Sequence, residues 1–397
     1  MSDELSCAEL KQRLDRGDPL LLLDVRPTRE IARFKIEAGR PLDRLELPYT
    51  RIVAEADDDD LSRATRAYAA AHLAERLPRD RPIVTVCAKG GASGFVAGGL
   101  RALGYPAQNL RGGMIAWGNH YDVRPAVEAA GVVVLQVSRP ARGCISWIVA
   151  ADGHAVVIDP LRHVEPYLAA LAERGLTLDF VLDTHAHADH LSGGRELGSR
   201  TGAPYGLHPY DAIHPLDALP ATFAFASLWE GWSWQRGDVR LEALHVPGHT
   251  LGHLAYLLDG RYLFSGDTVF LQSIARPDLG GRTEAWTPLH QRSLARLMAL
   301  PDDTLVLPGH ATGPQEADEA GRFLAPLGRL RESNAGLRAA AGPPEAFAAF
   351  ILANLPEFPP QYVDIKRANV GLIAPSPEHA EELELGRNVC ALAGASG

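Results

Sequence analysis

The sequence predicts an α/β protein with two domains in series. The chain has 397 residues, more than the roughly 250 to 300 that one hydrophobic core usually serves. Up to residue 118, apolar runs of strand length alternate with segments typical of helices. After residue 131, strand-like runs follow one another closely between Gly and Pro, which predicts hairpins. We therefore expect domains at 1–118 and 131–397, joined by a linker at 119–130 that carries Pro125.

The first domain contains a strand, a glycine loop and a helix in direct succession around Cys87. Residues 83–86 form a buried type of strand that ends at Cys87, and a loop with two glycines then leads into an apolar segment. Four consecutive aspartates at 57–60 predict a solvated loop. Strands are expected at 20–25 and 83–86, and helices at 61–77 and 95–103.

In the second domain, four apolar strands each run into Gly, Pro or Asp and then into a potential metal ligand. These ligands are the histidine cluster that begins at His185, and then His249, Asp267 and His310. Groups at strand ends are held by a rigid scaffold and stay accessible at its rim. The tail from Gly342 onward is rich in proline, which predicts short helical pieces. Strands are expected at 132–137, 145–150, 155–158, 180–183, 240–246, 261–265 and 304–307, and a helix at 164–173.

Composition narrows the classes of function. The net charge is −10 with scattered basic residues, which argues against nucleic acid as a partner. No apolar run approaches the roughly 20 residues that span a bilayer, and the acidic N-terminus predicts a cytoplasmic protein. Four cysteines lie far apart, so we expect neither disulfides nor a thiolate zinc site, and we expect Cys7, Cys144 and Cys390 to be inert. A homodimer is the commonest assembly for such a chain.

The segment 184–190 predicts a metal site. It places His185, His187 and His190 beside Asp189, and residues two apart in an extended loop point to the same side. Imidazole nitrogen and carboxylate oxygen are donors that suit zinc or iron. Other histidines, including His245 and His253, are expected to be structural.

Cys87 is the second candidate reactive group. It lies where a buried strand meets a glycine loop and the start of a helix, and backbone N–H groups together with the positive helix end favour a thiolate there. The same donors would stabilise an anionic persulfide, and Lys89 adds a positive charge nearby.

Four motifs together resemble the metallo-β-lactamase superfamily. They are THAHADH at 184–190, PGHT at 247–250, SGD at 265–267 and PGH at 308–310, and the resemblance covers about 200 residues from Val132 to Pro314. It implies an αββα sandwich with the metal at one edge. It does not settle the reaction, because the superfamily includes thioester hydrolases and persulfide dioxygenases.

The resemblance allows two metal assignments. A glyoxalase II-like site would use all seven ligands for two ions, with Asp267 bridging them. One ion would lie on His185, His187 and His249, and the other on Asp189, His190 and His310. A persulfide dioxygenase-like site would hold one Fe(II) on His185, His249 and Asp267, leaving His187, Asp189, His190 and His310 as supporting residues. The ligands alone do not decide between these assignments. The cofactor we expect is one Fe(II), with two zinc ions or a mixed iron and zinc pair as the alternative.

Two further segments resemble persulfide dioxygenases and related rhodanese fusions, at 268–282 and 358–369. Within the first, Arg276 is a candidate for binding a substrate carboxylate, and an ion pair with Asp278 is the equal alternative.

Residues 5–118 resemble a rhodanese domain. The resemblance rests on LLLLDVRP at 20–27, CAKGGAS at 87–93 and NLRGGMIAW at 109–117. It implies that Cys87 accepts sulfane sulfur and passes it to an acceptor, with Lys89 as a substrate-binding residue. Many rhodaneses have an arginine where this loop has Ala92, which leaves the rate and preference of transfer open.

The two resemblances together predict a persulfide dioxygenase that is coupled to a sulfurtransferase. It would oxidise a low-molecular-weight thiol persulfide, in the first place glutathione persulfide, with O2 to sulfite, and Cys87 would exchange sulfur with sulfite, thiosulfate or the thiol. The alternative is a glyoxalase II-like thioester hydrolase with an attached sulfurtransferase. A third reading is a sulfur carrier with a regulatory or degenerate metal site.

Overall fold

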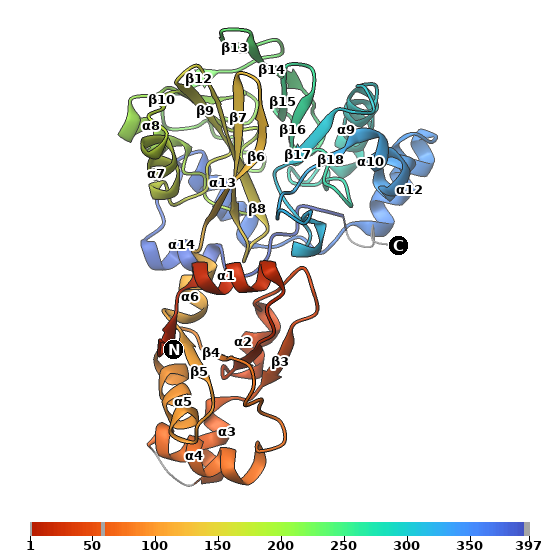
Figure 1. Ribbon diagram of the computed structural model, residues 1–397. Coiled ribbons are helices and arrows are strands. Elements are labelled where there is room, and N and C mark those ends of the chain that lie inside the picture. Colours follow the sequence, from red (N-terminus) through yellow and green to blue (C-terminus); the bar gives the residue numbers. More distant parts are fainter. Residues whose placement is uncertain (1, 57–59, 393–397) are drawn as a thin grey trace. The chain divides into compact units, whose positions relative to one another are not determined.

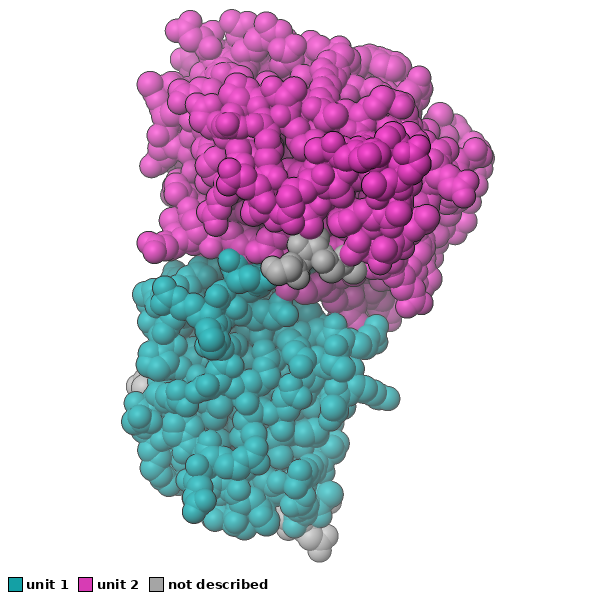
Figure 2. Space-filling model, turned by 90° about the vertical axis from the view of Figure 1, so that its right-hand side faces the viewer, with its two compact units in different colours: residues 1–120, 139–142, 313–315 teal, residues 121–138, 143–312, 316–397 magenta. Residues whose placement is uncertain are grey.

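The computed structural model describes residues 2–56 and 60–392 and divides into two compact units (Figure 1). The first unit runs to His120 and includes 139–142 and 313–315, and the second comprises 121–138, 143–312 and the chain from 316 onward. Figure 2 colours the two units separately. Asp57, Asp58 and Asp59 of the predicted solvated loop lie outside the described residues, and Asp60 caps the helix that follows.

The first unit contains a five-stranded sheet in the order β1-β5-β4-β2-β3, and all its neighbouring strands are parallel. Its strands are β1 (Glu4–Leu5), β2 (Leu21–Asp24), β3 (Asp43–Glu46), β4 (Ile83–Val86) and β5 (Ala107–Leu110). Its helices are α1 (Cys7–Arg16), α2 (Thr28–Arg33), α3 (Tyr49–Ala56), α4 (Leu61–His72), α5 (Gly91–Ala102) and α6 (Gly113–Gly118).

Both faces of this sheet are buried, as the continuous apolar runs predicted. Leu21 and Leu23 belong to one core cluster, whereas Leu22 belongs to the other. Successive side chains on a strand point to opposite faces, so a strand that is apolar at every position must be covered on both sides. Helix α5 begins at Gly91, four residues earlier than predicted, and therefore starts directly after the Cys87 loop.

The second unit contains two sheets. The first has the order β12-β11-β10-β9-β8-β7-β6 and the second β13-β14-β15-β16-β17-β18. The first comprises β6 (Asp122–Ala129), β7 (Val132–Arg139), β8 (Cys144–Ala151), β9 (His154–Ile158), β10 (Thr177–Leu182), β11 (Tyr205–Leu207) and β12 (Ala226–Ser227). The second comprises β13 (Ser233–Arg236), β14 (Val239–His245), β15 (Leu254–Leu258), β16 (Tyr262–Gly266), β17 (Leu305–Pro308) and β18 (Ala325–Pro326).

Helices cover the outer face of each sheet, which gives the expected αββα sandwich (Figure 1). Trp147 and Val149 of β8 point into the core between the sheets, and Ile148 points outward to the layer that includes Tyr167. The helices are α7 (Glu165–Glu173), α8 (Gly194–Thr201), α9 (Thr283–Leu297), α10 (Leu327–Ser333) and α11 (Ala335–Ala340), then α12 (Pro344–Asn354), α13 (Gln361–Asn369) and α14 (Pro377–Leu383) of the proline-rich tail.

The predicted linker at 119–130 is wrong for most of its length. Residues 122–129 form β6, which pairs antiparallel with β7 at the edge of the first sheet. The register shifts between Pro125 and Val127, and an edge strand tolerates a proline at such an irregularity because its missing N–H is not needed by a second neighbour. Among the residues that the structure describes, no helix has the length and apolarity that crossing a membrane requires.

Trp147 is expected to hold the two sheets together. Its side chain is 1% exposed, packs edge-on against Phe264 of the other sheet at 5.9 Å between ring centroids, and donates to the carbonyl of Pro308 at 3.2 Å. Trp147→Ala should lower stability by about 3–5 kcal/mol because it opens a cavity between the sheets. Urea unfolding followed by circular dichroism measures this.

Trp229→Ala is the matched control, because that indole is 50% exposed. It should change the stability by only about 0.5 kcal/mol. Equal effects of the two substitutions would contradict the role given to Trp147.

Candidate metal centre and candidate thiol site

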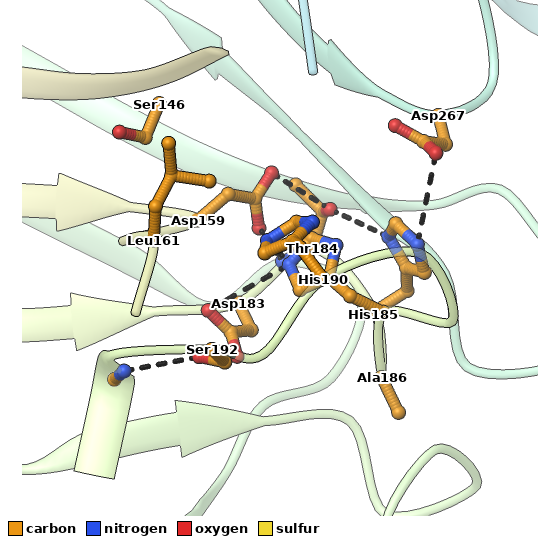
Figure 3. Close-up of polar contacts among 12 residues, drawn as sticks. Ser146, Asp159, Leu161, Asp183, Thr184, His185, Ala186, His190, Ser192 and Asp267 are labelled. Atoms are coloured by element: carbon orange, nitrogen blue, oxygen red, sulfur yellow. Dashed lines mark hydrogen bonds and ion pairs between the residues drawn. The ribbon is translucent and has the colours of Figure 1, made fainter. Parts of the chain in front are cut away.

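The loop after β10 carries the first ligands and is held by a buried carboxylate. Asp159, directly after β9, accepts hydrogen bonds from the backbone N–H of Thr184 at 2.6 Å and from its hydroxyl at 2.9 Å. Figure 3 shows Asp159 reaching Thr184 and the ring of His185 turned toward Asp267. The two parallel strands β9 and β10 end side by side, so this contact fixes the start of the histidine loop.

His185, His249 and Asp267 form the first donor set. One ligand atom from each residue lies within 4.8 Å of the others, and all three side chains are fully buried. The Oδ2 atom of Asp267 is 3.9 Å from Nε2 of His185 and 3.6 Å from Nε2 of His249. These three atoms have no hydrogen-bond partner. Buried polar atoms are otherwise almost always paired, so the set fits a metal ion that these atoms would hold.

The two imidazoles are oriented for ligation through Nε2. Nδ1 of His249 donates to the carbonyl of Arg276 at 2.8 Å, and Nδ1 of His185 lies 2.9 Å from the hydroxyl of Thr184. A partner on one ring nitrogen fixes the tautomer and leaves the other nitrogen for the metal. Burial lowers the pKa of both histidines, and for His185 the neighbouring histidines lower it further. The neutral imidazole that a metal requires is therefore favoured.

Asp267 follows β16 and is anchored by two histidines. Its backbone N–H donates to Nε2 of His253 at 3.0 Å, and its Oδ1 accepts from Nδ1 of His310 at 2.6 Å. Burial alone would raise the pKa of Asp267, but attraction to His310 and the hydrogen bond from it lower the pKa to about 2. His253, expected to be structural, thus supports Asp267. Its ring also stacks on the ring of His185, with 4.8 Å between the centroids.

A second donor cluster lies next to the first and contains a cysteine. Cys144, Asp189, His190 and His310 are all buried, with one ligand atom of each within 4.8 Å of the others. Nε2 of His310 is 2.8 Å and Sγ of Cys144 is 3.5 Å from Oδ2 of Asp189. Cys144 is buried as expected, and tertiary contacts bring its thiol among the predicted donors, whereas its inertness stays a prediction.

His187 does not join the first donor set. Its Nε2 lies 3.2 Å from Oδ1 of Asp159 and 3.9 Å from Oδ1 of Asp183, and these three residues form a cluster of their own. Both nitrogens of this ring are buried without a hydrogen-bond partner. The tightest grouping of donor atoms therefore joins His185, His249 and Asp267 without His187, although the rings of His187 and His185 lie 4.2 Å apart between centroids.

Sequence reasoning missed Asp211 and Asn369, which clamp the ligand loops. Asp211 accepts from the backbone N–H of Ala186 at 2.8 Å, the hydroxyl of Thr250 at 2.7 Å and the N–H of Gly252 at 2.8 Å. Asn369 of α13 donates to the carbonyls of His187 and His190 at 2.9 Å and 2.8 Å. Nothing in the local sequence marks Asp211, and the segment 358–369 was noted without a role for Asn369, because both residues act across the fold.

Arg276 is not available to bind a substrate. Its guanidinium is fully buried and forms two hydrogen bonds with Asp278, at 2.6 Å and 2.8 Å. The remaining N–H groups donate to backbone carbonyls of the tail, at Pro356, Glu357 and Val389. The ion pair is therefore the correct alternative, and Arg276 fastens the tail to the segment that follows Asp267.

The thiol of Cys87 lies at the end of β4, beside the N-terminus of α5. The backbone N–H of Gly90 donates to its sulfur at 3.1 Å, and the hydroxyl of Ser93 lies 3.2 Å from it. The same hydroxyl contacts Oδ1 of Asn109 at 2.7 Å. Lys89 is exposed in this loop, and its role in substrate binding stays a prediction. The site suits a sulfur atom that carries negative charge, because the backbone N–H of Gly90 and the start of α5 both face it.

Comparisons with known proteins agree with this architecture. Residues 6–120 match a rhodanese-like domain, and residues 139–310 match the metallo-beta-lactamase superfamily. A hydroxyacylglutathione hydrolase of Xanthomonas euvesicatoria pv. vesicatoria is 40% identical over 163 residues, 41% of this chain and 58% of that relative. The match thus spans less than two thirds of the hydrolase.

Two solved structures are similar in fold. A metallo-beta-lactamase from Staphylococcus aureus has a TM-score of 0.51 at 26% identity and covers 60% of this chain and 72% of its own. ETHE1 from Myxococcus xanthus has a TM-score of 0.48 at 26% identity, and the match covers 63% of this chain and 98% of the ETHE1 chain.

Removal of the Asp211 clamp should weaken metal binding. Asp211→Asn replaces one acceptor oxygen by an NH2 group, which cannot accept a hydrogen bond from the N–H and O–H donors that face it. The loops at 186 and 250–252 then lose their common partner. We expect metal affinity to fall by roughly 10–100-fold, the usual cost of losing an outer-shell group. Metal retention during dialysis against a chelator measures it.

The control is Asp303→Asn, which removes an exposed carboxylate in the turn before β17. It should retain metal like the unmodified chain. A clamp variant that also retained metal fully would show that Asp211 does not support the ligands.

Proposed function

Because the chain joins a rhodanese-like domain to a domain with the metallo-β-lactamase fold, we propose that it is a persulfide dioxygenase coupled to sulfur transfer. The observation that carries the proposal is the donor set of His185, His249 and Asp267. Two imidazoles and one carboxylate are the set used by non-haem Fe(II) oxygenases. When bound, Fe(II) supplies redox chemistry and open positions for a sulfur substrate and dioxygen.

The residues of this chain would position the reaction. The carbonyl of Arg276 holds the ring of His249, and the His310 contact holds the carboxylate of Asp267. Phe270 lies 6.1 Å from His310 between ring centroids and belongs to a buried apolar cluster that includes Ala188 of the histidine loop. A site of fixed donors that excludes water favours one substrate geometry.

The two proposed reactions share an intermediate. In the metal domain, a thiol persulfide RSSH, O2 and water give RSH, sulfite and two protons. In the rhodanese-like domain, sulfite takes the outer sulfur of a Cys87 persulfide, which gives thiosulfate and returns the thiolate of Cys87. In the reverse direction, a Cys87 persulfide would load a small thiol such as glutathione for oxidation.

A glyoxalase II-like hydrolase is the second candidate. The similarity to the hydroxyacylglutathione hydrolase and the presence of a second donor cluster favour it. The grouping of donor atoms favours the dioxygenase, because His185, His249 and Asp267 form one group without His187, whose Nε2 lies 3.2 Å from Oδ1 of Asp159.

One experiment separates the two candidates. The purified chain is analysed for metal and then assayed with glutathione persulfide in an oxygen electrode and with S-lactoylglutathione by thiol release. The dioxygenase predicts iron and oxygen uptake. Absence of oxygen uptake by the iron-loaded chain, together with thioester hydrolysis, would overturn the proposal.

His249→Ala and His187→Ala should differ in effect. The first removes a proposed ligand, so we expect iron to be lost and oxygen uptake to fall by more than about 100-fold. The second removes a supporting ring, so we expect iron to be retained and oxygen uptake to fall by about 10-fold or less. Iron content and oxygen uptake of both variants measure this, and equal loss of iron would support the glyoxalase II-like assignment.

Cys87→Ser should abolish thiosulfate sulfurtransferase activity and leave oxygen uptake with glutathione persulfide unchanged. Ser93→Ala keeps the nucleophile and removes one hydrogen-bond donor, so transfer should slow by roughly 10-fold, equivalent to about 1.4 kcal/mol. Cyanide-dependent thiocyanate formation from thiosulfate is the assay. Sulfur transfer by Cys87→Ser would contradict the assignment of the nucleophile.

A further inference from the structure

Helix α13 carries a lysine that is buried and has no partner. The side chain of Lys366 is 4% exposed. Among residues 2–56 and 60–392, no group accepts a hydrogen bond from its amino group, and no carboxylate forms an ion pair with it. A buried ammonium without a partner is unfavourable, because it has lost its hydration and has gained nothing in return. Such a group is a candidate for binding an anion.

We propose that Lys366 binds the sulfur group that the metal centre oxidises, in its final form as the sulfite anion, beside the donor set of His185, His249 and Asp267. The inference rests on the proposed function, which names sulfite as the product. It adds a binding residue to which that function gives no role.

The face of α13 that carries Lys366 is turned toward the histidine loop. Residues three, four and seven apart share one face of a helix, so Tyr362 and Asn369 lie on either side of Lys366. Asn369 donates to two carbonyl groups of the loop at 187–190, at 2.9 Å and 2.8 Å. Tyr362 belongs to the buried cluster that contains Ala188 of the same loop. Lys366 therefore points toward the loop that begins with the first ligand.

A neighbouring face of α13 is held by another loop. Arg367 forms ion pairs with Asp217 at 2.7 Å and with Asp364 at 3.0 Å. Nε2 of His214 lies 3.3 Å from the carbonyl oxygen of Val363. These contacts fix the helix about its own axis, so the direction of Lys366 is set by the fold.

The charge of Lys366 acts on the first donor set. Burial lowers the pKa of His185 and of His249, and the positive charge of Lys366 acts on both in the same direction. Burial also lowers the pKa of Lys366 itself, which attraction to Asp211 and Cys390 partly opposes. Asp211 forms no ion pair with Lys366, and its oxygens accept from the donors of the ligand loops. An anion beside the donor set would give the amino group the partner that it lacks.

The charges of the site favour a sulfur oxyanion. The carboxylate of Asp267 balances only part of the charge of a divalent ion, and Lys366 adds a further positive charge. An ammonium group has three donors, which the oxygens of sulfite can accept. Oxidation of a persulfide to sulfite increases the negative charge near Lys366. An interaction that strengthens as the reaction proceeds promotes that reaction.

Sulfite binding to the zinc-loaded chain tests the inference without relying on activity. Zinc suits the donor set and has no redox chemistry, so isothermal titration calorimetry with sodium sulfite measures binding alone. Lys366→Met keeps the length and the apolar stem of the side chain and removes its charge. We expect the affinity for sulfite to fall by roughly 10–100-fold, the usual effect of losing a hydrogen bond to a charged group.

Two controls accompany this measurement. Arg367→Met removes a positive charge from the same helix, on the face that pairs with Asp217, and should bind sulfite like the unmodified chain. S-methylglutathione carries the carboxylates of glutathione without an anionic sulfur, so Lys366→Met should bind it unchanged. The inference would be overturned by a wild-type chain that binds no sulfite, by equal sulfite affinity in Lys366→Met, or by an equal loss for S-methylglutathione or in Arg367→Met.

Stability separates a binding residue from a structural one. Lys366→Met replaces a desolvated ammonium by an apolar side chain of similar length, so the midpoint of urea unfolding should stay the same or rise. Zinc content should be unchanged. A lower midpoint together with loss of zinc would show that Lys366 supports the fold, and would count against the inference.

The outcome can be told apart from that of the dioxygenase test. Absence of oxygen uptake by the iron-loaded chain, with sulfite binding that depends on Lys366, would count against the proposed function alone. Oxygen uptake with sulfite binding that Lys366→Met leaves unchanged would count against the role of Lys366 alone.

Discussion

The burial of unpaired imidazole and carboxylate groups at one edge of a sandwich is the constraint on which the second unit depends. His185, His249 and Asp267 are fully buried, and the atoms that face one another have no hydrogen-bond partner. Such an arrangement is unfavourable unless an ion satisfies it. The surrounding fold supplies rigid strand ends, and buried carboxylates such as Asp211 hold the loops against the repulsion of the donors.

Some hydrogen bonds that hold the metal-binding loops come from residues far along the chain. Asn369 in α13 binds the carbonyls of the histidine loop, and Arg276 binds carbonyls of the tail. The proline-rich tail is thus part of the scaffold of the metal centre. The tail carries none of the donors His185, His249 and Asp267, yet it lies against the loops that do, because it supports them.

The two units use different physical means to prepare reactive groups. The first unit presents the sulfur of Cys87 to N–H and O–H donors at the start of a helix, where negative charge is stabilised. The second unit buries His185 and His249, whose pKa burial lowers, beside the carboxylate of Asp267, where a cation is stabilised. Under the proposed function, the sulfur atom would meet both environments.

The sequence by itself determined the strands, the Cys87 loop and the order of the donors, because strand-length apolar runs and the motifs after them are local features, and the resemblance of those motifs to a superfamily implied the αββα architecture. Only the tertiary structure decided how the donors group, since that depends on which strand ends meet. It separated His187 from the first donor set, brought Cys144 opposite His310, and paired Arg276 with Asp278. It also turned most of the expected linker into β6, because an edge strand accepts Pro125. Contacts between residues tens of positions apart or more leave no local pattern, and most of the contacts that define this site are of that kind.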